Sequence, residues 1–232
     1  MNRFLYIVTL VFLASCGQTN NNSDKKEIVP TDTVSMILEN TLARNFRLTD
    51  TTVKFLWRAN RYDEVVKDTF NSIFIDENFC KTISDPERAA LGYVATFIGN
   101  ECNWDGNFKD DRSNLKCTIL TALNLGYQCS QKHLGFLRQL FKNDPKVLEE
   151  VKTDNCPTTP DGATIQNTFD EITLTVKGNE ILIFFKASGI NSREDDSWSW
   201  TETDHFQVDG DNIKLIKKDK SKVKHEHFEM GE

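Results

Sequence analysis

The stretch that decides the fold is Glu171 to Phe185, EITLTVKGNEILIFF. Ile172, Leu174 and Val176 alternate with threonines, which is the two-residue period of a strand with one buried face. The Gly178-Asn179 pair is typical of a tight hairpin turn, and a dense apolar run follows it. The segment therefore predicts two antiparallel strands joined by a short turn.

Strand patterns continue downstream of this hairpin. Trp198 and Trp200 share one strand face, and Asp209-Gly210 is a second turn candidate. Further alternating residues follow, and a last strand is expected within residues 223–230. We therefore expect an antiparallel β domain of four or five strands over residues 163–230.

Helical patterns dominate upstream. Ser84-Asp85-Pro86-Glu87 combines an N-cap, an early proline and a capping-box glutamate. Residues 50–83 allow two short helices, or a strand around residues 73–75. Further helices are expected over residues 33–46, 85–98, 113–125, 131–142 and 145–152. Two prolines and a glycine within residues 157–162 mark a domain edge. The predicted fold class is α+β, with an N-terminal bundle of four to six helices over residues 32–156 followed by the β-meander.

The start of the sequence has the pattern of an export leader. A basic start at Arg3 precedes a ten-residue apolar run, which is about half the length that a membrane-spanning helix needs. Leu13-Ala14-Ser15-Cys16 follows, and it resembles the lipobox of bacterial lipoproteins. The resemblance implies that residues 1–15 are a signal peptide and that Cys16 is the lipidated first residue of the mature chain.

The same resemblance implies an address and a partner. Acyl chains on Cys16 would bind a membrane, and Gly17 in place of an aspartate favours the outer membrane, on its periplasmic or surface side. Residues 16–31 are polar and are expected to form a flexible tether. The resemblance covers the leader alone.

Composition excludes some function classes. The net charge of −7 shows no basic excess of the kind that nucleic-acid binding needs. We recognise no nucleophile elbow, phosphate loop or zinc-protease helix. We therefore expect no cofactor, no metal and no catalytic residues.

Five cysteines remain after Cys16, and an exported protein is expected to form disulfides. The expected helices bring the chain together at two places, which favours the pairs Cys102–Cys117 and Cys129–Cys156. Cys80 is then the unpaired cysteine. Spacing alone leaves other pairings open.

The most unusual stretch is residues 193–205, REDDSWSWTETDH. On a regular strand, Glu202 and Asp204 would share the apolar face of the two tryptophans. Either a bulge moves these carboxylates off that face, or they lie beside the aromatic rings in a cleft. A cleft of that kind suits a sugar or a cationic ligand. The candidate binding residues are Arg193, Glu194, Trp198, Trp200, Glu202 and Asp204.

Two weaker motifs have simpler explanations. His225 and His227 share a strand face and could bind zinc, but no third ligand is evident. Asp105, Asp110 and Asp111 could suggest calcium, but their order fits no ligand loop. We interpret both as solvated surface.

These features predict a lipid-anchored envelope protein with a non-enzymatic binding role. A specific version is an inhibitor of, or immunity protein to, a toxin or lytic enzyme, with a protein partner. One alternative is a lipoprotein that binds or hydrolyses glycans through Glu202 and Asp204. Another is a structural component of the envelope.

Overall fold

The predicted hairpin forms the centre of the sheet. In the computed structural model, which describes residues 48–98, 115–128, 130–153, 165–191 and 193–227, β3 (Ile165–Lys177) pairs with β4 (Glu180–Asn191). The turn between them passes through Gly178, whose φ of +58° costs a glycine little because it has no Cβ.

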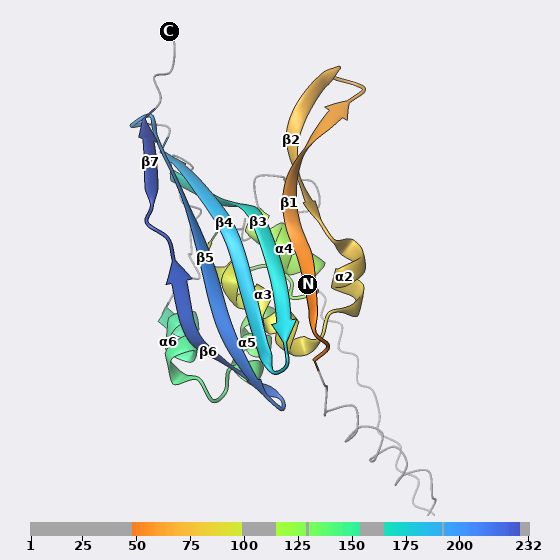
Figure 1. The fold of residues 1–232 in the computed structure, drawn as a ribbon, viewed down its shortest axis with the longest axis vertical. Coiled ribbons are helices and arrows are strands. Elements are labelled where there is room, and N and C mark those ends of the chain that lie inside the picture. Colours follow the sequence, from red (N-terminus) through yellow and green to blue (C-terminus); the bar gives the residue numbers. More distant parts are fainter. Residues whose placement is uncertain (1–47, 99–114, 129, 154–164, 192, 228–232) are drawn as a thin grey trace, which may run out of the picture. The chain divides into compact units, whose positions relative to one another are not determined.

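The described strands form a seven-stranded antiparallel sheet (Figure 1). The order is β2-β1-β3-β4-β5-β6, and β7 also pairs with β5. The other strands are β1 (Thr51–Asp63), β2 (Asp68–Ile75), β5 (Asp196–Asp209), β6 (Asn212–Lys220) and β7 (Lys224–His227). β6 and β7 pair with successive parts of the same edge of β5, so together they form one interrupted edge.

The expectation of an N-terminal helical bundle is wrong, because the sheet comes first among the described elements. Residues 51–75, where two short helices were the first prediction, form the β1–β2 hairpin. A β-bulge between Lys54 and Leu56 buries Phe55 and Leu56 in succession, which hides the two-residue alternation of a strand. In β2, Phe70, Ile73 and Phe74 happen to recur at helical spacing.

The helices lie between the first hairpin and β3 in the sequence. They are α2 (Glu77–Thr82), α3 (Asp85–Phe97), α4 (Leu115–Ala122), α5 (Gln131–Leu140) and α6 (Pro145–Thr153). The capping box at the start of α3 is confirmed, because the Ser84 hydroxyl accepts from the Glu87 N–H and the Glu87 carboxylate accepts from the Ser84 N–H. The expected helix over residues 33–46 lies outside the described residues.

One face of the sheet packs against the helices, and α3 is in contact with β4, β5 and β6 (Figure 1). Alternate residues of β4, including Ile181, Ile183 and Phe185, are buried in this interface. Burying apolar side chains of this size stabilises the fold by about 1.5–3 kcal/mol each. A cavity between the sheet and the helices can therefore form only on this face of the sheet.

The two parts predicted on either side of residues 157–162 share this sheet. β1 pairs with β3 from Thr51 opposite Val176 to Trp57 opposite Glu171, and Asn40–Glu232 form one compact unit. Within the described ranges, no helix has the length and apolar character needed to cross a membrane.

Candidate functional site

The two carboxylates of β5 lie on its buried face. β5 pairs with β4 without a bulge from Asp196 to Gln207, so the strand alternates regularly. Trp200, Glu202 and Asp204 consequently point to the helix side, and Glu202 and Asp204 are only 8% and 2% exposed. Of the two arrangements that the sequence allows, the structure has the one with carboxylates beside aromatic rings.

A β-bulge in β6 decides which side chains face these carboxylates. From the turn onward, Phe206 pairs with Leu215, but His205 pairs with Lys217. Ile216 is therefore the extra residue, and its side chain is 57% exposed. A single extra residue exchanges the two faces of the strand beyond it.

As a result, Lys218 lies opposite Asp204 and Lys220 lies opposite Glu202. Without the bulge, Asp219 would stand opposite Glu202, and three carboxylates would gather on the buried face. The bulge thus gives each buried acid a basic neighbour.

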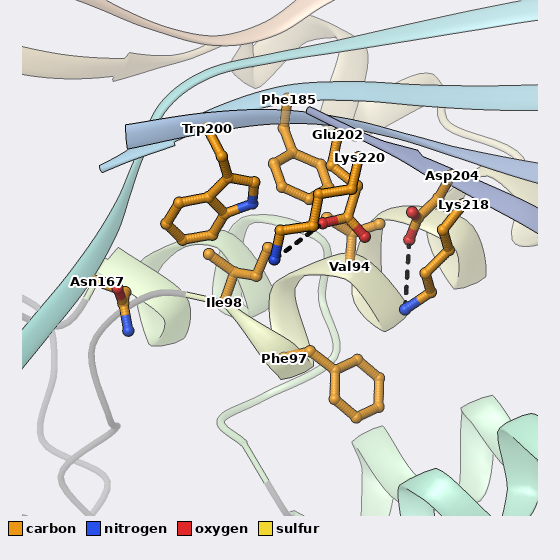
Figure 2. A pocket seen from close by; sticks show the side chains of 10 residues that line it. All are labelled: Val94, Phe97, Ile98, Asn167, Phe185, Trp200, Glu202, Asp204, Lys218 and Lys220. Carbon is orange, nitrogen blue, oxygen red and sulfur yellow. Dashed lines mark ion pairs between the residues drawn. The ribbon is translucent and has the colours of Figure 1, made fainter. Parts of the chain in front are cut away.

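These side chains line a cavity of about 360 Å³ between α3 and the sheet. Figure 2 shows the side chains of β5 and β6 pointing from the strands toward α3. The lining residues are Val94, Phe97, Ile98, Asn167, Phe185, Trp200, Glu202, Asp204, Lys218 and Lys220. The volume falls in the lower part of the range of small-ligand pockets, roughly 300–1,000 Å³.

Both lysines pair loosely with the acids and closely with aromatic rings. The Nζ–Oδ2 distance from Lys218 to Asp204 is 3.9 Å, and the Nζ–Oε2 distance from Lys220 to Glu202 is 3.8 Å (Figure 2). The Lys220 ammonium lies 4.8 Å from the centre of the Trp200 ring. Such distances balance charge while leaving ammonium hydrogens available to a ligand.

Two buried polar atoms of the cavity residues lack a hydrogen-bond partner among the described residues, Trp200 Nε1 and Asp204 Oδ1. Burial, the main cause, raises the pKa of Asp204 to about 7; Glu202 also raises it, while Lys218 opposes the shift. An unpaired buried donor or acceptor costs about 1–3 kcal/mol. Both groups would therefore gain from a ligand that can donate and accept.

The other candidate residues of this stretch lie elsewhere. Arg193 and Glu194 are exposed in the turn between β4 and β5. Trp198 lies further along the face, where its indole N–H donates to Asn167 Oδ1 at 2.9 Å. Trp198 also crowds Gly189, where any Cβ would stand 2.2 Å from the indole ring.

No group of three or more potential metal ligands is found in the described part of the chain. His225 Nδ1 instead lies 3.1 Å from Asp196 Oδ2 across the β5–β7 pair. Asp105, Asp110 and Asp111 lie outside the described residues. The zinc and calcium alternatives gain no support.

Cys80 is a free cysteine, and burial raises the pKa of its thiol to about 11, which disfavours the reactive thiolate. Cys117 is disulfide-bonded. Cys16, Cys102, Cys129 and Cys156 lie outside the described residues, so the pairing stays a prediction.

Sequence reasoning missed the lysines and the α3 side chains of the cavity. Lys218 and Lys220 have the same spacing as Glu202 and Asp204, and the turn at Gly210 would have paired the two strands. Pairing the two strands residue by residue from that turn would place Lys217 opposite Asp204, however, because this regular register leaves out the extra residue Ile216.

The described part of the chain is an antiparallel sheet covered by helices on one face, with a partly open, charge-paired cavity under α3. Searches against protein-family models, curated proteins and solved structures found no match for the chain.

Proposed function

We propose that the chain is a lipid-anchored binding protein of the bacterial envelope, and that the cavity under α3 holds a saccharide unit. The observation that carries this proposal is the pair of buried, unpartnered polar atoms, Trp200 Nε1 and Asp204 Oδ1, on residues that line one cavity. Burying them without a ligand costs stability, whereas a bound ligand would recover it.

A saccharide fits the cavity because its hydroxyl groups both donate and accept hydrogen bonds. Glu202 and Asp204 supply acceptors, and Lys218, Lys220 and the Trp200 indole supply donors. Val94 and Phe97 of α3 and Ile98, which directly follows the helix, form an apolar wall against which the C–H face of a sugar ring can pack.

Binding is favoured over hydrolysis. A glycoside hydrolase places its two carboxyl groups on either side of the scissile bond. Glu202 and Asp204 come from one face of one strand, so both lie on the same wall of the cavity. Each acid also has an ammonium group within 4 Å, as its ion pair with Lys220 or Lys218 requires.

Calorimetric titration tests the proposal. The probes are oligomers of N-acetylglucosamine and of a neutral hexose, added to the mature chain. Trp200→Ala and Asp204→Asn should each weaken binding by tenfold or more. Thr203→Ala is the matched control, because Thr203 lies between the two acids on the opposite face of β5, and it should bind like the wild type.

Absence of binding to every probe by the folded wild type would overturn the saccharide ligand. Release of reducing ends that Glu202→Gln abolishes would establish hydrolysis in place of binding.

The lipid anchor has its own test. Cys16→Ala should abolish incorporation of labelled fatty acid and retention in the membrane fraction. Persistence of both would contradict the anchor and leave the cavity proposal standing.

An inhibitor or immunity role and a structural role in the envelope remain further proposals, because the cavity bears on neither. Affinity capture with the mature chain tests the first. The inhibitor proposal predicts one stoichiometric protein partner, and a capture without such a partner would reject it.

A further inference from the structure

The two edges of the sheet differ in the number of charged side chains that they carry. The edge formed by β6, β7 and the residues between them carries lysines at positions 214, 217, 218, 220, 222 and 224. Lysines on an edge strand are a common means of preventing another strand from pairing there. This edge is therefore protected against edge-to-edge association.

The opposite edge has no such protection. β2 reads Asp68-Thr-Phe-Asn-Ser-Ile-Phe-Ile75, without lysine, arginine or proline. It is the end strand of the sheet, and among the described strands it pairs with β1 alone. Phe70 is 42% exposed on it. An open, apolar edge of this kind is a template for another strand.

Part of the hairpin that carries this edge also has no neighbouring strand on its other side among the described strands. β1 pairs with β3 only as far as Trp57, so the part of the β1–β2 hairpin beyond that residue is a two-stranded ribbon (Figure 1). Arg58 ties its base to β3, with Nε donating to Asp170 Oδ1 at 2.7 Å. A two-stranded ribbon is only marginally stable in water, and added strands stabilise it.

We propose that two copies of the chain pair through β2, antiparallel about a two-fold axis that passes between their Ser72 residues. A two-fold axis normal to the sheet keeps the same face of both copies on the same side, so two residues that oppose one another must point to the same face. An axis between two residues of β2 would instead pair neighbouring residues, which point to opposite faces. The axis must therefore pass at the position of a single residue of β2.

The Ser72 register is self-complementary. Phe70, Ser72 and Phe74 share one face because alternate residues of a strand do. With the axis at Ser72, Phe70 lies opposite Phe74 of the partner subunit, and the symmetry repeats this aromatic pair. No charged residue lies between Thr69 and Ile75. Just beyond this segment, Asp68 would lie opposite Asp76 of the partner subunit, and this like-charge pair opposes the association.

This symmetry favours a second copy over an unrelated strand. A segment with phenylalanines at equal distances on both sides of Ser72 forms its side-chain pairs with itself. Such pairs add to the stability that the main-chain hydrogen bonds give the interface. The inference uses no residue of the cavity, and its success or failure is independent of the saccharide proposal.

Disulfide trapping in intact membranes tests the register. Directly opposed residues of antiparallel strands have Cα atoms about 4.5–5.5 Å apart, which a disulfide can span. Ser72→Cys should therefore give a covalent dimer under mild oxidation. Asn71→Cys is the matched control, since the two Asn71 residues would be offset by two positions and roughly 8 Å apart.

Light scattering on the mature chain bearing Cys16→Ser, which takes no lipid, provides a second measurement. We expect a dimer, and Phe70→Lys should raise its dissociation constant tenfold or more without unfolding the chain, because Phe70 is partly exposed. Lys214→Glu on the far edge should leave the dimer unchanged.

Three outcomes would overturn the proposal. The first is a monomer at all concentrations up to about 100 µM. The second is a dimer in which Ser72→Cys forms no more cross-link than Asn71→Cys. The third is a monomer whose Ser72→Cys variant cross-links to a different protein, which would assign the edge to another partner.

Discussion

The free-energy cost of burying Asp204 in the folded chain depends on pH, because only the ionised carboxyl is costly to bury. Burial raises its pKa from 3.8 to about 7. Between these values the folded chain retains a proton that the unfolded chain has lost. The contribution of this group to stability is therefore full below about pH 4 and is lost as the pH rises through 7.

Replacing Asp204 with asparagine should remove this dependence. We expect Asp204→Asn to match the wild type near pH 4 and to exceed it at pH 8 by on the order of 2 kcal/mol in free energy of unfolding. Denaturant unfolding at the two pH values measures the difference.

Asp219→Asn is the control, because Lys217 lowers the pKa of that exposed carboxyl and the variant should gain nothing at high pH. An Asp204→Asn variant with the same pH profile as the wild type would show that Asp204 titrates normally.

Gly189 makes room for the Trp198 indole. A Cβ at residue 189 would lie 2.2 Å from that ring and 2.5 Å from Asn167 Oδ1. Gly189→Ala should therefore displace Trp198, break its hydrogen bond to Asn167, and lower the free energy of unfolding by about 1–3 kcal/mol.

Unfolding curves and the red shift of tryptophan fluorescence measure the effect. In the control, Gly135→Ala, the new Cβ meets nothing within 4 Å on α5, and it should be neutral or stabilising. A neutral Gly189→Ala with unchanged fluorescence would show that Trp198 does not lie over this glycine.

At the scale of the element, the bulge in β6 predicts which lysine of that strand contributes to the stability of the fold. In the bulged register Lys220 faces buried Glu202, whereas Lys217 faces solvent beside Asp219. Lys220→Glu should lower the free energy of unfolding by about 1–2 kcal/mol, because it places a second carboxylate against Glu202.

Lys217→Glu separates this register from a regular one. It should cost about 0.5 kcal/mol or less, as exposed charge changes usually do. In a strand without the bulge, Lys217 would face Asp204 and Asp219 would face Glu202. Greater damage from Lys217→Glu than from Lys220→Glu would therefore exclude the bulge.

At the scale of the whole molecule, local signals were enough to predict some elements and not others. The hairpin of β3 and β4 and the start of α3 were predictable, because turn and capping residues act on their immediate neighbours. The β1–β3 pairing was not, since it joins residues more than a hundred positions apart and its strand pattern is broken at Phe55 and Leu56.

The candidate site was predicted in part for the same reason. Strand alternation alone placed Trp200, Glu202 and Asp204 on one face. The lysines needed the register of β6, and the apolar wall needed the position of α3 over the sheet, neither of which is a local property.

The sharing of one sheet by both halves of the chain predicts how fragments behave. A fragment of residues 163–232 contains β3 to β7 but loses β1, and its buried face loses the helices that cover Ile183 and Phe185. A sheet with β3 as a newly open edge and with a bare apolar face is expected to aggregate or remain unfolded. We therefore expect this fragment to show no cooperative unfolding by near-ultraviolet circular dichroism.

The fragment of residues 40–232 is the matched control, because it retains the whole compact unit and should unfold cooperatively. Without the pairing of β1 to β3, β3 to β7 would meet the rest of the described chain only through side-chain contacts. A stable, monomeric fragment of residues 163–232 would mean that the helices and β1 cover a sheet that already folds, and that the cavity is an interface between two domains. An unfolded one would mean that the cavity residues of β5 are positioned only once α3 has packed against the sheet.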